Sequence, residues 1–235
     1  ELLDWAGRNQ IEIKSYEDIY SELLQKASGK CVWADRERVN WKLFGLLKNA
    51  ANIIEETSPV ELEKAVKNER EVENFRRAHE KDGAAVTRFL CWLKTHVGKE
   101  KITEISAAEK LEEFRREWDS YLLPSFEPIM AYQDHGAIVH YSACERTDRE
   151  LKPEGLFLMD TGGQYREGTT DITRTAALGP LTKKQREHYT RVLIGNLRLA
   201  ALSFPYGCSG ENLDLAARAR LWEAGLVFMH GTGHG

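Results

Sequence analysis

The stretch LFLMDTGGQYREGTTDITRT, residues 156–175, decides which fold this chain can adopt. An apolar run ends on one acid, Asp160, and a second acid, Asp171, follows among threonines after a Gly-rich segment. β-Branched residues on both sides of a Gly-containing turn are typical of a β-hairpin. The stretch therefore predicts two neighbouring strands that each carry a carboxylate.

The register of this hairpin determines what the two acids can do. If the chain turns at Tyr165 and Arg166, counting outward places Asp160 directly opposite Asp171. Opposed residues have Cβ atoms about 4.5–5.5 Å apart, where two ionised carboxylates repel each other. A shared proton would relieve the repulsion, and so would two divalent ions about 3.5–4 Å apart that activate a bridging water. The alternative is a pair of ordinary loop acids, with Asp160 forming an Asx turn beside Gly162.

Three histidines favour a site over ordinary loop acids. His230 and His234 are four residues apart in MHGTGHG, but the three glycines disfavour a helix, so this is not the helical HExxH zinc motif. We predict an irregular ligand-binding segment there, preceded by an apolar strand, GLVFM. His140 is predicted on a further strand, GAIVHY. A histidine taken alone is more often structural, and His140 by itself favours an ordinary strand residue, whereas two histidines in one Gly-rich segment are as consistent with a site as with a structural role.

Composition limits the classes of protein that this chain can represent. Its 235 residues suffice for one large domain or for a domain plus part of another, and 42% hydrophobic with 30% charged residues is an ordinary globular mix. A formal charge of −4 gives no sign of a nucleic-acid or membrane partner, and no apolar run is long enough to span a bilayer. The four cysteines form no CxxC pair. We therefore expect a cytoplasmic protein with reduced, mostly buried thiols.

Two kinds of organisation follow each other along the chain. Residues 1–57 alternate short helices and short strands, which predicts α/β units. Ser58 and Pro59 then provide an N-cap and a first helical residue, so a new segment is expected to begin there. Residues 58–235 place long helices before and after a β-rich stretch at 125–179, and we predict an α+β fold for them.

Three motifs, GAIVHY, MDTGGQYREGTTDITRT and HGTGHG, together resemble the M24 metallopeptidase family, whose catalytic domain has the pita-bread fold. Their order and spacing agree with that family, and the spelling HGTGHG resembles its three-domain aminopeptidase P (Xaa-Pro aminopeptidase) branch. The resemblance covers residues 58–235. It implies that this part is the beginning of a pita-bread catalytic domain and that residues 1–57 are the end of a preceding creatinase N-terminal-like α/β domain.

The resemblance implies a role for each candidate residue. Asp160 and Asp171 match the two metal-binding Asp residues of the family, and His234 matches its metal-binding His. His230 matches a histidine thought to contact the substrate and the developing tetrahedral intermediate, and His140 matches another histidine on the substrate side. The family's complete set of four carboxylates and one imidazole is rich in oxygen, which suits two Mn²⁺ ions, with Zn²⁺ or Co²⁺ as alternatives.

Two further metal-binding Glu residues of the family have no counterpart in this chain. In the family they lie on later strands, so the resemblance implies that the chain stops before them. A long helix and a capped second helix precede the strands at 125–179, and the same pair recurs at 182–224. This repetition predicts a second set of strands after residue 235.

The function implied by the resemblance is removal of an N-terminal residue that precedes proline. The expected partners are peptide substrates with proline in the second position and a second copy in a homodimer, with neither nucleic acid nor membrane. Three alternatives stay open: a non-catalytic pita-bread peptide-binding module, another M24 peptidase such as a prolidase, and a metal-independent hydrolase resembling creatinase. Retention of the acids and histidines favours the metallopeptidase.

Overall fold

The computed structural model describes residues 2–234, and the chain divides after Asn68 into two compact units. The first unit contains a parallel strand pair whose connection is a helix, which is the βαβ arrangement predicted from the alternating pattern. Its elements are α1 (Leu2–Arg8), η1 (Tyr16–Asp18), α2 (Ile19–Ala27), β1 (Cys31–Trp33), α3 (Trp41–Ala50), β2 (Asn52–Ile54) and α4 (Pro59–Ala65).

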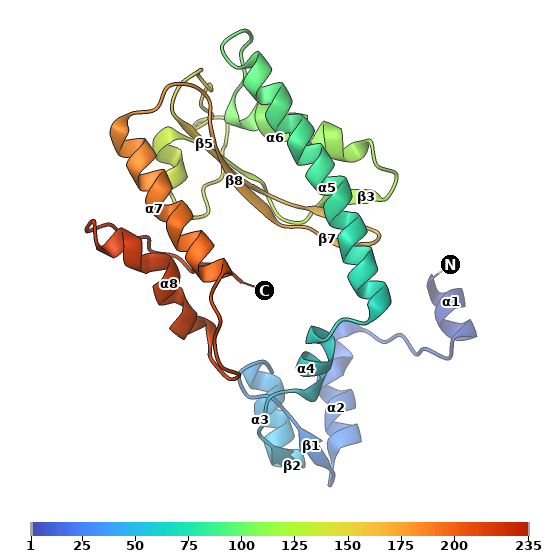
Figure 1. The fold of residues 1–235 in the computed structure, drawn as a ribbon. Coiled ribbons are helices and arrows are strands. Elements are labelled where there is room, and N and C mark those ends of the chain that lie inside the picture. The colour runs from blue at the N-terminus through green and yellow to red at the C-terminus, as the bar shows by residue number, and fades with distance from the viewer. Residues whose placement is uncertain (1, 235) are drawn as a thin grey trace. The chain divides into compact units, whose positions relative to one another are not determined.

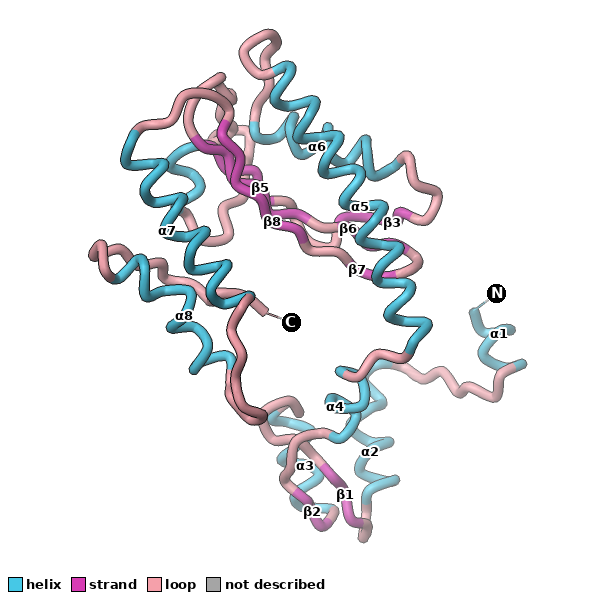
Figure 2. The backbone as a smooth tube through the Cα atoms, in the orientation of Figure 1, coloured by secondary structure: helices cyan, strands magenta, loops and turns pink. Residues whose placement is uncertain are grey.

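The second unit has long helices around two small antiparallel sheets, ordered β4-β5-β8 and β3-β6-β7 (Figure 1). Figure 2 shows the strands of both sheets following one another along a single twisted ribbon. The elements are α5 (Glu69–His96), α6 (Glu104–Arg116), β3 (Tyr121–Pro124), β4 (Ile129–Tyr132), η2 (Gln133–Ala137), β5 (Leu156–Thr161), β6 (Gly163–Tyr165), β7 (Gly168–Thr169), β8 (Ile172–Ala177), α7 (Lys183–Ala200) and α8 (Gly210–Trp222). This mixture of helices and antiparallel strands is the α+β class predicted from the sequence.

One hydrophobic core joins α5 and α6 to one face of the β4-β5-β8 sheet. Along β5 the side chains alternate, with Phe157, Met159 and Thr161 buried and the residues between them only partly buried. The core includes Val86, Phe89, Leu93, Leu111, Met130, Phe157 and Met159. Asp160 therefore lies on the face of β5 that this core does not cover.

The structure corrects two predicted strands. GAIVHY does not form a strand: η2 ends at Ala137, and Ile138 and Val139 are 54% and 47% exposed. GLVFM is irregular, with Val227 and Met229 exposed. Among residues 2–234, no strand pairs with either segment, so their apolar residues have β propensity without a ladder to join.

Two smaller expectations also change. The long helical pattern that begins near Pro59 is divided into α4 and α5, with Val66 extended between them. All four cysteines are free, as expected, but Cys31, Cys91 and Cys144 are exposed rather than buried. No helix within the described residues combines the length and the apolar character needed to cross a membrane.

A glycine allows α7 and α8 to pack against each other closely, and this contact provides a test of the fold. A Cβ on Gly195 would lie 2.3 Å from the carbonyl oxygen of Ala217 on α8. We predict that Gly195→Ala lowers the free energy of unfolding by about 1–3 kcal/mol, because backbone atoms would have to move apart. Urea denaturation measures the loss. Gly83→Ala in α5 is the matched control: nothing lies within 4 Å of its Cβ position, so a gain of up to ~1 kcal/mol is expected. Equal effects of the two substitutions would contradict the packing argument.

Candidate metal centre

The hairpin exists, but its register differs from the predicted one by two residues. β6 pairs with β7 so that the turn is centred on Arg166 and Glu167, and Asp160 on β5 pairs with Thr173 on β8. The predicted direct opposition of Asp160 and Asp171 is therefore wrong. An even shift keeps every side chain on its original face, whereas a shift of one residue would exchange the faces. The two acids become diagonal neighbours, a relationship that typically separates Cβ atoms by about 7–8 Å or somewhat less.

The neighbours of the two acids show which way the acids project. Thr161 follows Asp160 and Thr170 precedes Asp171, and both threonines are fully buried. Because successive side chains of extended segments point to opposite faces, the two acids project away from the buried side together. Gly162 permits this close fold, since a Cβ there would lie 2.0 Å from the carbonyl oxygen of Thr170. Both carboxylates thus share one face of the hairpin.

Each acid has its own polar contact. The hydroxyl of Thr173 donates a hydrogen bond of 2.7 Å to Asp160 Oδ1. Asp171 Oδ2 lies 3.2 Å from Nε2 of His234, and these side chains are 42% and 78% exposed. Neither of these contacts joins the two acids to each other. The structure does bring together Asp171 and His234, two of the three residues predicted to bind metal.

Two residues of α8, Arg218 and Asp214, attach the histidine segment, residues 228–234, which carries His230 and His234. Arg218 donates hydrogen bonds of 2.7 Å to the carbonyl oxygens of Phe228 and His230. It also pairs with Asp214, which accepts a hydrogen bond from the Thr232 hydroxyl. The hydrogen bonds from Thr232 and Arg218 lower the pKa of Asp214. His230 itself is exposed. Its ring nitrogen Nδ1 lies 2.7 Å from the carbonyl oxygen of Gly231, and its ring packs against Phe228 with 4.6 Å between the ring centroids.

His140 lies in a turn, not on the predicted strand. Its backbone is left-handed, with φ 54°, and its side chain is exposed. The adjacent Tyr141 is buried and donates a 2.8 Å hydrogen bond to Glu104, a fully buried carboxylate of α6. Burial and this hydrogen bond raise the pKa of Tyr141. A non-glycine residue in this backbone region costs about 1–3 kcal/mol and is found preferentially at functional sites.

The chemistry of the donors fits a divalent ion. Asp160 and Asp171 offer hard oxygen ligands and His234 offers an imidazole, a set that suits Mn²⁺ or Zn²⁺. Among residues 2–234, however, no three His, Cys, Asp or Glu side chains converge closely enough to hold an ion as they stand. Asp171 and His234 contact each other, whereas Asp160 lies too far away to form a three-donor group with them. Binding by all three donors would therefore require the exposed His234 to adjust.

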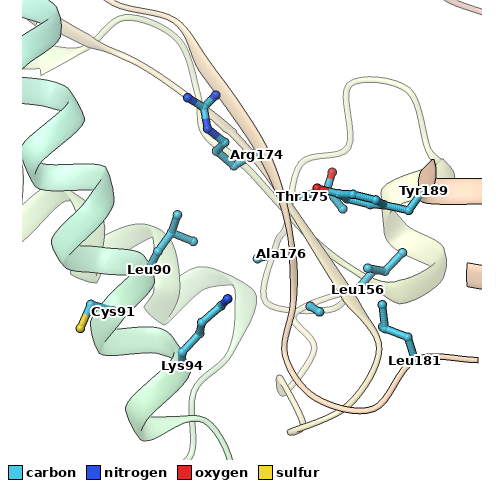
Figure 3. A pocket seen from close by; sticks show the side chains of 10 residues that line it. Leu90, Cys91, Lys94, Leu156, Arg174, Thr175, Ala176, Leu181 and Tyr189 are labelled. Carbon is cyan, nitrogen blue, oxygen red and sulfur yellow. The ribbon is translucent and has the colours of Figure 1, made fainter. Parts of the chain in front are cut away.

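A hollow on this unit is separate from these residues. It is an open pocket of about 480 Å³ between α5, β8 and the start of α7, and none of the predicted site residues lines it (Figure 3). Its walls include Leu90 and Lys94 of α5, Thr175 of β8 and Tyr189 of α7. The candidate centre is instead a shared, open face of the hairpin and the histidine segment.

The sequence prediction missed two residues under the hairpin, Asp82 of α5 and Arg115 of α6. A charged stretch such as the one around Asp82 is typical of a solvated helix face, yet Asp82 is fully buried and Arg115 is 2% exposed. A signal was present, because Asp82 follows Ala78 by four residues and precedes Val86 by four, on the apolar stripe of α5. Their ion pair contacts the threonines beside both acids.

Comparisons with known proteins show which families the two parts of the chain resemble. The model of metallopeptidase family M24 matches residues 73–235, and the model of the creatinase/prolidase N-terminal domain matches residues 1–71. Xaa-Pro aminopeptidase 2 of Sus scrofa is 39% identical over 226 residues, covering 96% of this chain and 34% of the relative. Xaa-Pro aminopeptidase 1 of Dictyostelium discoideum is 37% identical over 230 residues, covering 96% and 36%. The chain thus spans about a third of the length of these relatives.

Solved structures show the same architecture. The X-prolyl aminopeptidase of Caenorhabditis elegans, described as a cytosolic enzyme with a di-nuclear active site, superposes with a TM-score of 0.89 at 35% identity. The match covers 98% of this chain and 38% of that structure. The prolidase of Pyrococcus furiosus superposes with a TM-score of 0.70 at 24% identity, covering 92% and 60%, and shows likeness of fold alone. The predicted pita-bread architecture is confirmed.

The tip of the hairpin provides a test that depends on pH. Lys81 Nζ of α5 lies 2.5 Å from Glu167 Oε1, and this hydrogen bond lowers the pKa of Glu167 from its ordinary 4.5. A lowered pKa in the folded state stabilises the fold above about pH 4.5, and that contribution disappears as the pH falls through the folded-state pKa. We predict that Lys81→Met costs about 1 kcal/mol at pH 7 and markedly less at pH 3. Urea unfolding at both pH values, with Lys94→Met as a control of equal charge change, measures this; a cost independent of pH would refute it.

The attachment of the histidine segment provides a second test. Arg218→Lys keeps the charge but loses the guanidinium fork that reaches two carbonyl oxygens at once. We predict that amides of residues 228–232 exchange with deuterium at least several-fold faster in this variant, whereas amides of α5 are unchanged. Arg198→Lys, an exposed position on α7, is the control. Unaltered exchange at 228–232 would show that Arg218 does not hold the segment.

Proposed function

The chain belongs to metallopeptidase family M24, and on that premise we propose that it serves as an Xaa-Pro aminopeptidase. The reaction is hydrolysis of the bond between an N-terminal residue and a following proline. The observation that supports this best is the contact between Asp171 and His234, because it joins two motifs 63 residues apart in the sequence at one open face. The aminopeptidases of S. scrofa, D. discoideum and C. elegans, which this chain resembles over nearly its whole length, support the same activity.

We assign the metal-binding role to Asp160, Asp171 and His234. When bound, two divalent ions, which we propose to be Mn²⁺, would lower the pKa of a shared water and polarise the scissile carbonyl. The oxygen-rich donor set supports Mn²⁺ over a softer metal. The description of a di-nuclear active site in the C. elegans enzyme supports two ions. In this proposal the two acids fix the ions on the hairpin face, and His234 approaches from the other side.

We assign substrate contacts to His230 and His140. His230 is exposed four residues before His234, where its ring can donate a hydrogen bond to the oxyanion that develops during hydrolysis. His140 is exposed in a left-handed turn that Glu104 anchors through Tyr141, and we propose that it contacts the peptide. The proline preference itself is supported only by the relatives.

Three further assignments belong to the same proposal. Residues 1–57 would be the end of a creatinase N-terminal-like domain and residues 58–235 the first part of the catalytic domain; the family models and the compact units change over at 68–73. A homodimer and a cytoplasmic location are proposed as well, the latter supported by the cytosolic C. elegans enzyme. Sedimentation velocity tests the dimer, and a single monomer boundary would disprove it.

The decisive experiment uses the protein at its natural length. We predict that it binds about two Mn²⁺ per chain in isothermal titration and releases alanine from Ala-Pro-Ala but not from Ala-Ala-Ala. Asp171→Asn should abolish turnover and weaken Mn²⁺ binding at least 10-fold, because a ligand is lost. Asp119→Asn, an exposed acid in the turn after α6, should leave both unchanged.

Other results of this experiment would each support a different function for the chain. Peptide binding without metal or turnover would replace the proposal with a non-catalytic binding module. Cleavage of Ala-Pro but not of Ala-Pro-Ala would identify a prolidase. Metal-independent hydrolysis would identify a hydrolase resembling creatinase.

A further inference from the structure

An ion pair is buried beneath the hairpin that carries the two acids. Asp82 on α5 is 0% exposed, and Arg115 on α6 is 2% exposed. Arg115 donates from Nε to Oδ1 at 2.7 Å and from Nη2 to Oδ2 at 3.1 Å, a bidentate arrangement. The pair therefore has the fixed geometry that two charges need when they are removed from water.

This pair extends to the residue beside each acid. Arg115 uses its remaining nitrogen, Nη1, to donate a 2.6 Å hydrogen bond to the hydroxyl of Thr161, which follows Asp160. The hydroxyl of Thr170, which precedes Asp171, donates a 2.5 Å hydrogen bond to Oδ2 of Asp82. One ion pair thus holds both strands of the hairpin, each at the position adjacent to a carboxylate.

Additional hydrogen bonds close this network. Asp82 Oδ1 accepts a 3.1 Å hydrogen bond from the Tyr165 hydroxyl, so Asp82 accepts four hydrogen bonds in all. The Thr170 hydroxyl also accepts a 2.9 Å hydrogen bond from the backbone of Gly163. Ser125, the residue after β3, donates a 2.9 Å hydrogen bond to the carbonyl oxygen of Thr170. With these partners in place, the two threonines have little freedom to turn or to slide along the hairpin.

We propose that Asp82 and Arg115 are positioning residues for the metal centre. By holding Thr161 and Thr170 on the buried side, they fix Asp160 and Asp171 on the opposite face at a constant diagonal spacing. This inference rests on the proposed function, since the acids need that spacing only if they bind ions together. Asp82 and Arg115 hydrogen-bond the threonines next to the acids, so they would act on the ligands through the backbone. Loss of groups that orient metal ligands typically costs 10–100-fold in metal affinity.

The test removes the two hydroxyls and leaves the charges paired. Replacing Arg115 would leave Asp82 unpaired in the core and could unfold the protein, so it is not informative. Thr161→Val with Thr170→Val keeps the shape and β-branching of both residues. Thr175→Val on β8 is the matched control, with the same chemical change on the same sheet. The natural-length protein is titrated with Mn²⁺ alone, and amide exchange across residues 160–171 is measured without metal.

We expect the double variant to bind Mn²⁺ 10–100-fold more weakly than the unmodified protein. Its metal-free amides at 160–171 should exchange about 10-fold faster, and Thr175→Val should change neither quantity. Unchanged Mn²⁺ affinity in a folded double variant would overturn the inference. Asp82 and Arg115 would then only connect the helices to the hairpin, without influencing metal binding. If the unmodified protein binds no Mn²⁺, the proposed function fails instead, and unchanged exchange at 160–171 would then overturn the positioning role independently.

Discussion

The ion pair between Asp82 and Arg115 is the interaction on which the arrangement of the second unit depends. Burying two charges costs several kcal/mol per ion, and only good geometry with additional hydrogen bonds offsets that cost. Here the pair is bidentate, and Thr161, Thr170 and Tyr165 provide the additional hydrogen bonds. Apolar side chains could fill the same space, but they could not hold two threonines at defined positions. The pair therefore fixes the positions of both threonines and also connects the two helices to the hairpin.

The alternation of side chains carries this constraint to the surface. Because Thr161 and Thr170 are held on the buried side, the adjacent Asp160 and Asp171 must project outward. Gly162 lets the strands approach so closely that any side chain there would collide with backbone atoms. Buried groups on the opposite side of the hairpin therefore set the spacing of the acids. The open face can consequently remain accessible without losing that spacing.

Local sequence patterns predicted most helices and strands, but they did not predict which strands pair or in which register. Propensity and capping account for the apolar run of β5, the β-branched residues of β8 and the helices α6 to α8. Thr103 and Thr182 illustrate the capping with their capping boxes. The hairpin register did not follow, because it is accompanied by contacts with distant elements, such as the hydrogen bond between Lys81 of α5 and Glu167 of the turn, 86 residues apart in sequence. Ile138 and Val139 show the same limitation, since strand propensity has no effect without a neighbouring strand. For the candidate site, the sequence motifs named Asp171 and His234, which the structure brings together, but they gave the wrong register for the acids. The predicted register places the two acids directly opposite each other, whereas the observed register makes them diagonal neighbours.

His234 is the donor that connects the candidate centre to a distant segment, because it contacts Asp171. The acids on one side of this centre and His234 on the other are held in different ways. The acids are fixed by a buried network, while His234 belongs to an exposed segment that Arg218 holds through two carbonyl oxygens. Because no three donors converge among the described residues, binding of one ion by all three would require the exposed His234 to move relative to the acids. The free energy of metal binding would then be reduced by the cost of ordering the histidine segment. In such a centre, the hydrogen bonds from Arg218 determine how well the histidine segment is ordered before metal binding.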